Sequence, residues 1–210
     1  MSMTEIDRKD RFWNRVRTLL GKGTAGRSHE GAAMLRGLDR RQVSGRPLEE
    51  ELQSAWMLAA ERRVSLCIMA LEIDSFGDYL TAYGRDAADD CLEALDQIIS
   101  PLLKRETDRC LRVGQSGFVL VLPDMPLLLG RDLANKITLA VRRAGLVNKE
   151  SHAGTVTLGA GMAVVNPQPP YDRDALELAR QALRRAQRRG LSRLDVADLR
   201  NTDDRKLVAA

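Results

Sequence analysis

The strongest constraint on the fold is one almost unbroken apolar run, VSLCIMALEI, at residues 64–73. A strand with one face in water alternates apolar and polar side chains, whereas a strand covered on both faces is apolar throughout. The run therefore predicts a central strand with helices packed on both faces of its sheet. We expect the other elements to be arranged around it.

The segments that follow alternate between helical and extended patterns. An apolar stripe predicts a helix over residues 86–104, whose last turn should be kinked or shortened by Pro101. Two short apolar runs flank Gly114-Gln115-Ser116 and predict a β-hairpin. The other predicted elements are a helix starting at Pro47, a helix at 127–144, a strand at 155–165, a helix at 172–189 and a strand at 193–197. This order predicts a ferredoxin-like α+β sandwich with a mostly antiparallel central sheet, preceded by an N-terminal helix.

The first part of the chain differs from the rest. Residues 4–20 can form a short amphipathic helix, and a Gly- and Ser-rich linker follows at 21–31. Such a helix could pair with a second copy or a partner through Trp13, or Trp13 could fold back onto the domain. We expect three parts: an N-terminal helix with a flexible linker (1–33), one folded domain (34–198) and a polar tail (199–210).

Composition indicates the compartment and the partners to expect. The polar N-terminus is not a signal peptide, and no apolar run reaches the roughly 20 residues of a membrane helix, so we expect a cytoplasmic protein without membrane insertion. Three widely spaced cysteines favour buried thiols over disulfides. The net charge of +4 does not favour nucleic acid as a partner. The basic cluster at 180–193 is better interpreted as a solvated helix face than as an anion-binding surface.

Five segments, in order, resemble motifs of the GGDEF family of diguanylate cyclases. They are LRGLDRR at 35–41, LEIDSFGDYLTAYG at 71–84, RVGQSGFVLVLP at 112–123, TLGAGMA at 157–163 and ALRRAQRRGLSR at 182–193. The third lies where the family has Arg-Tyr-Gly-Gly-Asp-Glu-Phe. The resemblance implies a nucleotidyl-cyclase-type αβ sandwich, and an activity that joins two GTP molecules into cyclic di-GMP.

That activity requires metal ions held by carboxylates, which neutralise phosphate charge and activate the nucleophile. The resemblance assigns one metal carboxylate to Glu72 and another to the hairpin, where Ser116 stands. The next hairpin acid corresponds to Gly117. Asp74, the second acid of the first motif, is better interpreted as capping the following turn than as a metal ligand. The resemblance thus predicts no catalytic residues, no bound metal and no enzyme activity.

The positions that hold GTP in the family also differ. The resemblance assigns the guanine contacts to Leu80 and Asp89, of which only Asp89 keeps the family's residue type. The phosphate-binding residues correspond to Gln187 and Leu191. In the hairpin Gly114 is kept, whereas the second glycine is Gln115. Metal, base and phosphate contacts therefore differ together.

A second nucleotide site of the family has the pattern Arg-x-x-Asp, four residues before the hairpin Arg. Arg105 and Asp108 match this pattern and spacing, and the family's assisting basic residue corresponds to Lys136. An Arg fork can donate to guanine O6 and N7, and a carboxylate can accept from N1–H and N2–H. The alternative is an ordinary solvated Arg–Asp pair.

Two functions from different classes follow. The first is a non-catalytic receptor for cyclic di-GMP that uses Arg105 and Asp108, and Lys136 as an assisting residue. The second is a ligand-free interaction or dimerisation module that binds an unidentified protein or a second copy. An active cyclase, or a polymerase-like activity that needs the same metal ligands, is disfavoured.

Overall fold

The computed structural model describes residues 47–200. Five strands form one sheet in the order β2-β3-β1-β4-β5. The strands are β1 (Leu66–Ile73), β2 (Arg109–Val113), β3 (Gly117–Pro123), β4 (Leu158–Val165) and β5 (Leu194–Asp198). All neighbours are antiparallel except β4 and β5. The predicted α+β sandwich with its mostly antiparallel sheet is confirmed.

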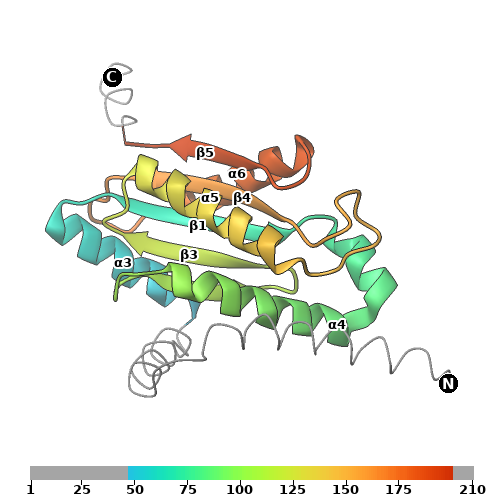
Figure 1. Cartoon of the computed structure of the whole chain (residues 1–210). Helices are drawn as coiled ribbons and strands as arrows, with labels where there is room; N and C mark the ends of the chain where they lie inside the picture. The colour runs from blue at the N-terminus through green and yellow to red at the C-terminus, as the bar shows by residue number, and fades with distance from the viewer. Residues whose placement is uncertain (1–46, 201–210) are drawn as a thin grey trace. The chain divides into compact units, whose positions relative to one another are not determined.

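The apolar run forms the central strand, as predicted. β1 lies between β3 and β4, and only Glu72 in it is not buried. Helices cover both faces of the sheet (Figure 1). They are α3 (Leu48–Arg62), α4 (Phe76–Ile99), α5 (Leu127–Ala144) and α6 (Asp174–Arg188), with a short 3₁₀ helix, η1 (Ser100–Leu102), after α4.

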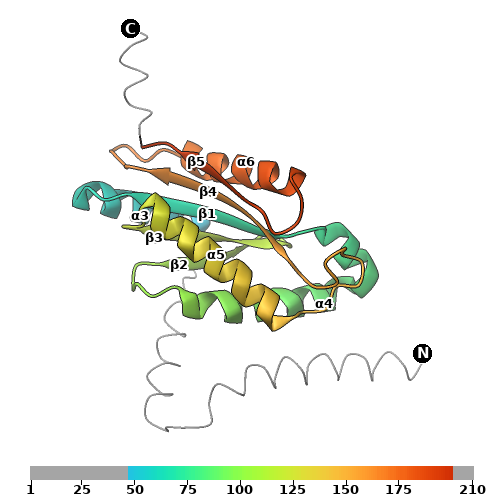
Figure 2. The same ribbon diagram turned by 45° about the horizontal axis from the view of Figure 1, so that its top comes forward.

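Alternate side chains of β1 serve the two faces. Ile68 and Ala70 lie in one buried cluster with residues of α3 and α6, including Leu52 and Ala179. On the other face α5 packs so closely that a Cβ at Gly130 would meet the Met162 and Cys67 sulfur atoms. Figure 2 shows α5 crossing the sheet with α6 on the other side. Burial on both faces is the physical reason for the unbroken apolar run.

The largest departure from the predicted boundaries is in α4. It begins at Phe76, ten residues before the predicted start, and contains a non-helical residue, Gly84, with φ 81°. It ends at Ile99, because Pro101 cannot continue the hydrogen-bond ladder and the chain tightens into η1. The shortening expected from Pro101 is confirmed, whereas the predicted extension to residue 104 is wrong.

The helix predicted at 4–20, the linker, Trp13 and the motif at 35–41 lie outside the described residues. Within residues 47–200, no helix has both the length and the apolar character needed to cross a bilayer.

Candidate functional site

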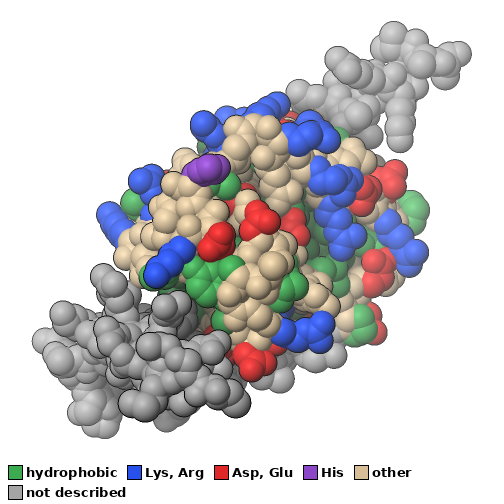
Figure 3. All heavy atoms as spheres, turned by 90° about the vertical axis from the view of Figure 1, so that its right-hand side faces the viewer, with side chains coloured by type: hydrophobic (Ala, Val, Ile, Leu, Met, Phe, Trp, Pro, Cys, Tyr) green, Lys and Arg blue, Asp and Glu red, His purple; other side chains and the backbone are tan. Residues whose placement is uncertain are grey.

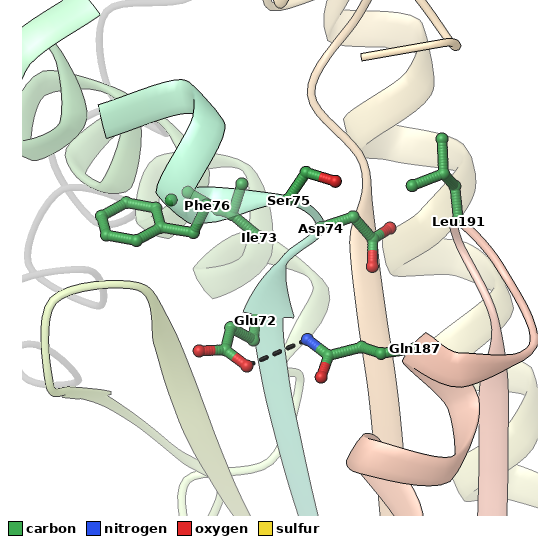
Figure 4. A pocket seen from close by; sticks show the side chains of 8 residues that line it. Glu72, Ile73, Asp74, Ser75, Phe76, Gln187 and Leu191 are labelled. Atoms are coloured by element: carbon green, nitrogen blue, oxygen red, sulfur yellow. Dashed lines mark hydrogen bonds between the residues drawn. The ribbon is translucent and has the colours of Figure 1, made fainter. Parts of the chain in front are cut away.

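The candidate site lies where β1 ends and α4 begins. A cavity of about 450 Å³ is lined there by eight residues: Glu72, Ile73, Asp74, Ser75, Phe76, Gly77, Gln187 and Leu191. Figure 4 shows the Glu72, Asp74 and Gln187 side chains near one another, with Leu191 beyond Asp74. Figure 3 views this end of the molecule, where acidic side chains near the centre are surrounded by basic ones. Four of the predicted positions are thus brought together.

The strand register explains why Glu72 can lie here. Its Cα is paired with Gly117 of β3 and with Gly159 of β4. A Cβ at Gly159 would lie 2.9 Å from the Asp74 Oδ1 atom and 3.0 Å from Gln187 Cγ. A Cβ at Gly117 would lie 2.0 Å from the Leu71 carbonyl oxygen. Because neither glycine has a side chain, the neighbouring backbone and side chains can occupy the space where a Cβ would lie.

Both oxygens of the half-buried Glu72 carboxylate accept hydrogen bonds from neutral side chains. The Ser116 hydroxyl donates to Oε1 at 2.5 Å, and the Gln187 amide donates to Oε2 at 2.9 Å. The backbone N–H of Ile73 also donates to the Ser116 carbonyl at 3.0 Å. The three predicted positions Glu72, Ser116 and Gln187 thus form one connected group that joins β1, the hairpin and α6.

Asp74 is buried, with 4% of its surface exposed. Its Oδ2 atom accepts from the Thr157 hydroxyl at 2.7 Å and from the Ser192 backbone N–H at 2.7 Å. Burial raises the pKa of this carboxyl, the two hydrogen bonds oppose that shift, and the nearby Glu72 charge adds to it. The interpretation of Asp74 as a turn cap is wrong, because its side chain points into the protein and Ser75 occupies the N-cap position of α4.

Thr157 and Ser192 are the site residues that sequence reasoning missed. Thr157 is 83 residues from Asp74, and Ser192 is 118 residues away and contributes a backbone N–H that any residue except proline has. Ser192 has φ 56°, a left-handed conformation unusual for serine. Both residues lie in segments that resemble motifs of the family, but no local pattern in the sequence pairs either of them with Asp74.

A smaller cavity, of about 210 Å³, contains the positions assigned to guanine. Its lining includes Leu80, Asp89 and Gln115, together with Phe76, Arg85 and Ala88. Asp89 forms an ion pair with Arg112 of β2, the residue that leads the hairpin motif. The predicted base contacts are therefore grouped, but Leu80 presents no polar atom and Asp89 is already paired.

Arg105 and Asp108 lie on the turn between η1 and β2. The Asp108 N–H donates to the Arg105 carbonyl at 3.1 Å, and the Arg105 N–H donates to the Asp108 carboxylate at 3.1 Å. Asp108 is 1% exposed. The Arg105 guanidinium donates to the carbonyls of Pro123, at 3.2 Å, and Asp124. The two side chains share a turn, but both are engaged by the protein itself.

Lys136 lies on α5 and is exposed. Its ammonium group is 2.5 Å from the Asp132 carboxylate one turn earlier. The basic cluster of α6 is also partly paired: Arg184 bonds Glu177, and Arg185 and Arg189 both bond Asp195. This pairing agrees with the interpretation of the cluster as a solvated helix face.

A metal site would need several ligand side chains close together. In the part of the chain that the structure describes, no three His, Cys, Asp or Glu side chains are grouped so that they could hold a metal ion. Glu72 and Asp74 are the two carboxylates that line the larger cavity, and the hairpin beside them contributes a hydroxyl at Ser116 and no side chain at Gly117.

Solved structures with the same fold are known. The GGDEF domain of DgcB from Caulobacter crescentus, solved in complex with c-di-GMP, is 21% identical, with a TM-score of 0.62 over 70% of this chain and 86% of that one. The GGDEF domain of YfiN (TpbB) from Pseudomonas aeruginosa is 26% identical, with a TM-score of 0.58 over 71% and 92%. Diguanylate cyclase SiaD from Pseudomonas aeruginosa, solved with its activator SiaC, is 21% identical, with a TM-score of 0.65 over 92% and 77%.

A comparison with curated proteins finds no match. The family model described as diguanylate cyclase, GGDEF domain, matches residues 43–193, well over half of the sequence. This range holds both cavities, the hairpin and the Arg105–Asp108 turn, and the chain therefore belongs to the GGDEF family.

Proposed function

We propose that this GGDEF-domain signalling protein does not cyclise GTP and acts by binding. The observation that carries the proposal is the pairing of Glu72, whose two carboxylate oxygens accept hydrogen bonds from Ser116 and Gln187. A magnesium ion held by this carboxylate would share its oxygens with those two donors. Magnesium would bind weakly there, because Ser116 is neutral and Gly117 carries no side chain, so the hairpin adds no acidic ligand.

The buried Asp74 does not compensate for the missing acids. Its raised pKa favours the protonated form relative to an exposed aspartate, and its Oδ2 atom already has two donors. Magnesium binds anionic oxygens in near-octahedral geometry and usually keeps several waters. The side chains that line this cavity therefore do not fit the metal centre that the family's reaction requires.

Substrate binding is disfavoured by separate groups. Leu80 cannot hydrogen-bond a base edge, and Asp89 would have to leave Arg112 to do so. Gln187 and Leu191, at the phosphate-binding positions, carry no positive charge to attract a triphosphate. Because base, phosphate and metal contacts differ at independent positions, one substitution could not restore the reaction.

The test is incubation with GTP and magnesium, followed by product detection. We expect no cyclic di-GMP from the unmodified chain, and none from Ser116→Asp, which restores one hairpin acid next to Glu72. Ser116→Ala is the matched control for any change in folding. Cyclic di-GMP formed by the unmodified chain would overturn the proposal.

We propose further that the ligand is cyclic di-GMP, bound at the Arg105–Asp108 turn. Support comes from the position of the turn directly before β2 and from the chemistry of an Arg fork with a carboxylate, which suits guanine. Asp108 is almost fully buried, so its carboxylate must rotate outward when the base binds. This rotation makes the affinity lower than that of a preformed site.

Isothermal titration tests the receptor function. We expect the unmodified chain to bind cyclic di-GMP, Arg105→Ala and Asp108→Asn to lose binding, and Lys136→Ala to weaken it less. Arg184→Ala is the matched control, since Arg184 forms a surface ion pair on α6. Absence of binding by the unmodified chain at tens of micromolar would rule out the receptor and leave the inactive domain.

The second candidate is a ligand-free interaction module. It is favoured by large apolar side chains that α5 exposes to solvent, with Leu128 77%, Leu129 49% and Leu139 46% exposed. SiaD, a structure with the same fold, was solved in complex with a protein activator, SiaC. Trp13→Ala and Leu128→Ser should then change the oligomeric state or the co-purifying partner. Unchanged behaviour of both variants in sedimentation and pull-down would argue against it.

A further inference from the structure

The Arg105 guanidinium has a second role in the ligand-free chain. It donates to the carbonyl oxygens of Pro123, at the end of β3, and Asp124, in the loop that leads into α5. These carbonyls are 18 and 19 residues further along the chain, so the contact is tertiary. A guanidinium that holds two backbone carbonyls fixes the path of the loop between them.

The loop contains one residue with a left-handed backbone conformation. Asp124 has φ 54°, in the left-handed region that aspartate occupies more often than most residues but at a higher cost than glycine, and Pro126 follows as the N-cap of α5. Such a residue persists where its surroundings determine its conformation. Two contacts do so here: the Arg105 Nη1 group, which donates to the Asp124 carbonyl, and the Met125 N–H, which donates to the Ser65 carbonyl at 3.3 Å.

Both carbonyls accept from the same guanidinium nitrogen, Nη1 of Arg105. An Arg that donates to guanine O6 and N7 through Nη1 and Nη2 has to turn Nη1 away from the Pro123 and Asp124 carbonyls. Asp108 also has a partner within the chain, because its Oδ2 atom accepts from the Arg105 backbone N–H. A guanine base that donates to this oxygen would compete with that backbone N–H. A ligand that engages Nη1 would therefore remove one of the two contacts that hold Asp124.

We propose that Arg105 is a latch: it restrains the strained Asp124 loop in the free chain, and engagement of its guanidinium by an anionic or guanine-bearing ligand releases the start of α5. The first turn of α5 exposes Leu128 and Leu129, so the released segment carries the most exposed leucines among the described residues. Identification of the ligand as cyclic di-GMP rests on the proposed function, whereas the latch itself does not.

The ligand-free arm of the test is hydrogen exchange mass spectrometry on the full chain. Arg105→Ala should accelerate exchange in peptides that cover Met125 to Gly130 by about fivefold or more, because the cost of a left-handed non-glycine residue is no longer opposed. Adding Asp124→Gly to Arg105→Ala should reduce this acceleration, since glycine accepts φ 54° without strain. Arg184→Ala is the control and should leave these peptides unchanged.

The outcomes separate the latch from the receptor. If Arg105→Ala exchanges like Arg184→Ala in this segment, the latch is wrong whatever binds. If cyclic di-GMP binds and exchange at 125–130 rises, both proposals hold; if it binds and exchange stays constant or falls, the receptor stands and the latch is wrong. If it does not bind, the receptor fails and the ligand-free comparison alone decides the latch.

Discussion

Individual carboxylates at the end of β1 have opposite environments although they are two residues apart. Glu72 is half-buried and receives two side-chain donors, whereas Asp74 is buried and receives one hydroxyl and one backbone N–H. Hydrogen bonds to a charged form stabilise that form, and burial destabilises it. The two positions should therefore respond in different ways to removal of the charge.

Glu72→Gln should lower the free energy of unfolding by about 1 kcal/mol at neutral pH, because an amide accepts from Ser116 and Gln187 with only one oxygen. In a site built for a metal ion, loss of one acid would instead relieve repulsion and stabilise the metal-free protein. Urea unfolding of Glu72→Gln and of the unmodified chain, with Glu61→Gln as an exposed control on α3, decides between these signs. A gain in stability for Glu72→Gln would contradict the pairing described for this carboxylate.

Asp74→Asn should change how stability depends on pH. The folded-state pKa of Asp74 is raised, so between its unfolded and folded pKa values the folded chain holds a proton that the unfolded chain releases. The free energy of unfolding contributed by this group is therefore complete below the unfolded pKa and is lost as pH rises through the folded pKa.

The Asp74→Asn variant should lack that decline. The measurement is urea unfolding at a series of pH values from acid to neutral. A parallel pH dependence in the variant and the unmodified chain would show that Asp74 titrates normally.

Helices and strands meet more closely at some glycines than any side chain would allow. At Gly161 of β4, a Cβ would lie 2.0 Å from the Leu183 backbone nitrogen and 2.2 Å from the Ala179 carbonyl oxygen of α6. The helix backbone thus rests directly on the strand. This contact sets the distance between α6 and the sheet, and with it the position of Gln187 beside Glu72.

Gly161→Ala should destabilise the domain by about 1–3 kcal/mol, because α6 would have to move away from β4. Gly77→Ala, at a helical glycine with open space around it, should be neutral or slightly stabilising. Thermal unfolding of the two variants provides the comparison. Equal melting temperatures for both would show that α6 can shift without cost.

The apolar pattern of β1 is sufficient to predict the central strand, because burial on both faces requires consecutive residues to be apolar. The start of α4 was not predicted, since Gly77 and Gly84 interrupt the helical pattern and Gly84 does break the helix locally. The grouping of Glu72 with Ser116 and Gln187 followed from the family resemblance. The bonds from Thr157 and Ser192 to Asp74 could not be predicted, because they join distant segments through ordinary groups.

The described domain as a whole offers few places for a divalent cation. Glu72 and Asp74 face one cavity, and no three potential ligand side chains are grouped anywhere in residues 47–200. A ligand that binds only the folded state raises its stability by RT ln(1 + [L]/Kd). Magnesium that binds weakly or not at all should therefore leave stability unchanged.

Addition of several millimolar magnesium should leave the melting temperature within experimental error. The same experiment with cyclic di-GMP should raise it if the receptor proposal holds, and Arg105→Ala should then abolish the rise. Calcium, or sodium chloride at equal ionic strength, controls for general salt effects. A specific rise with magnesium would mean that Glu72 or Asp74 binds the ion despite its present hydrogen bonds.

The contact at Gly117 has a consequence for how this hairpin can change over time. Because the Leu71 carbonyl fills the space of a Cβ there, an acid at position 117 could not be tolerated until β1 and β3 had first moved apart. Substitutions elsewhere in the strand pair would have to come before it and would carry no benefit of their own. A mutational route to an acid at position 117 therefore passes through unfavourable intermediates, a constraint that this contact does not place on an acid at position 116.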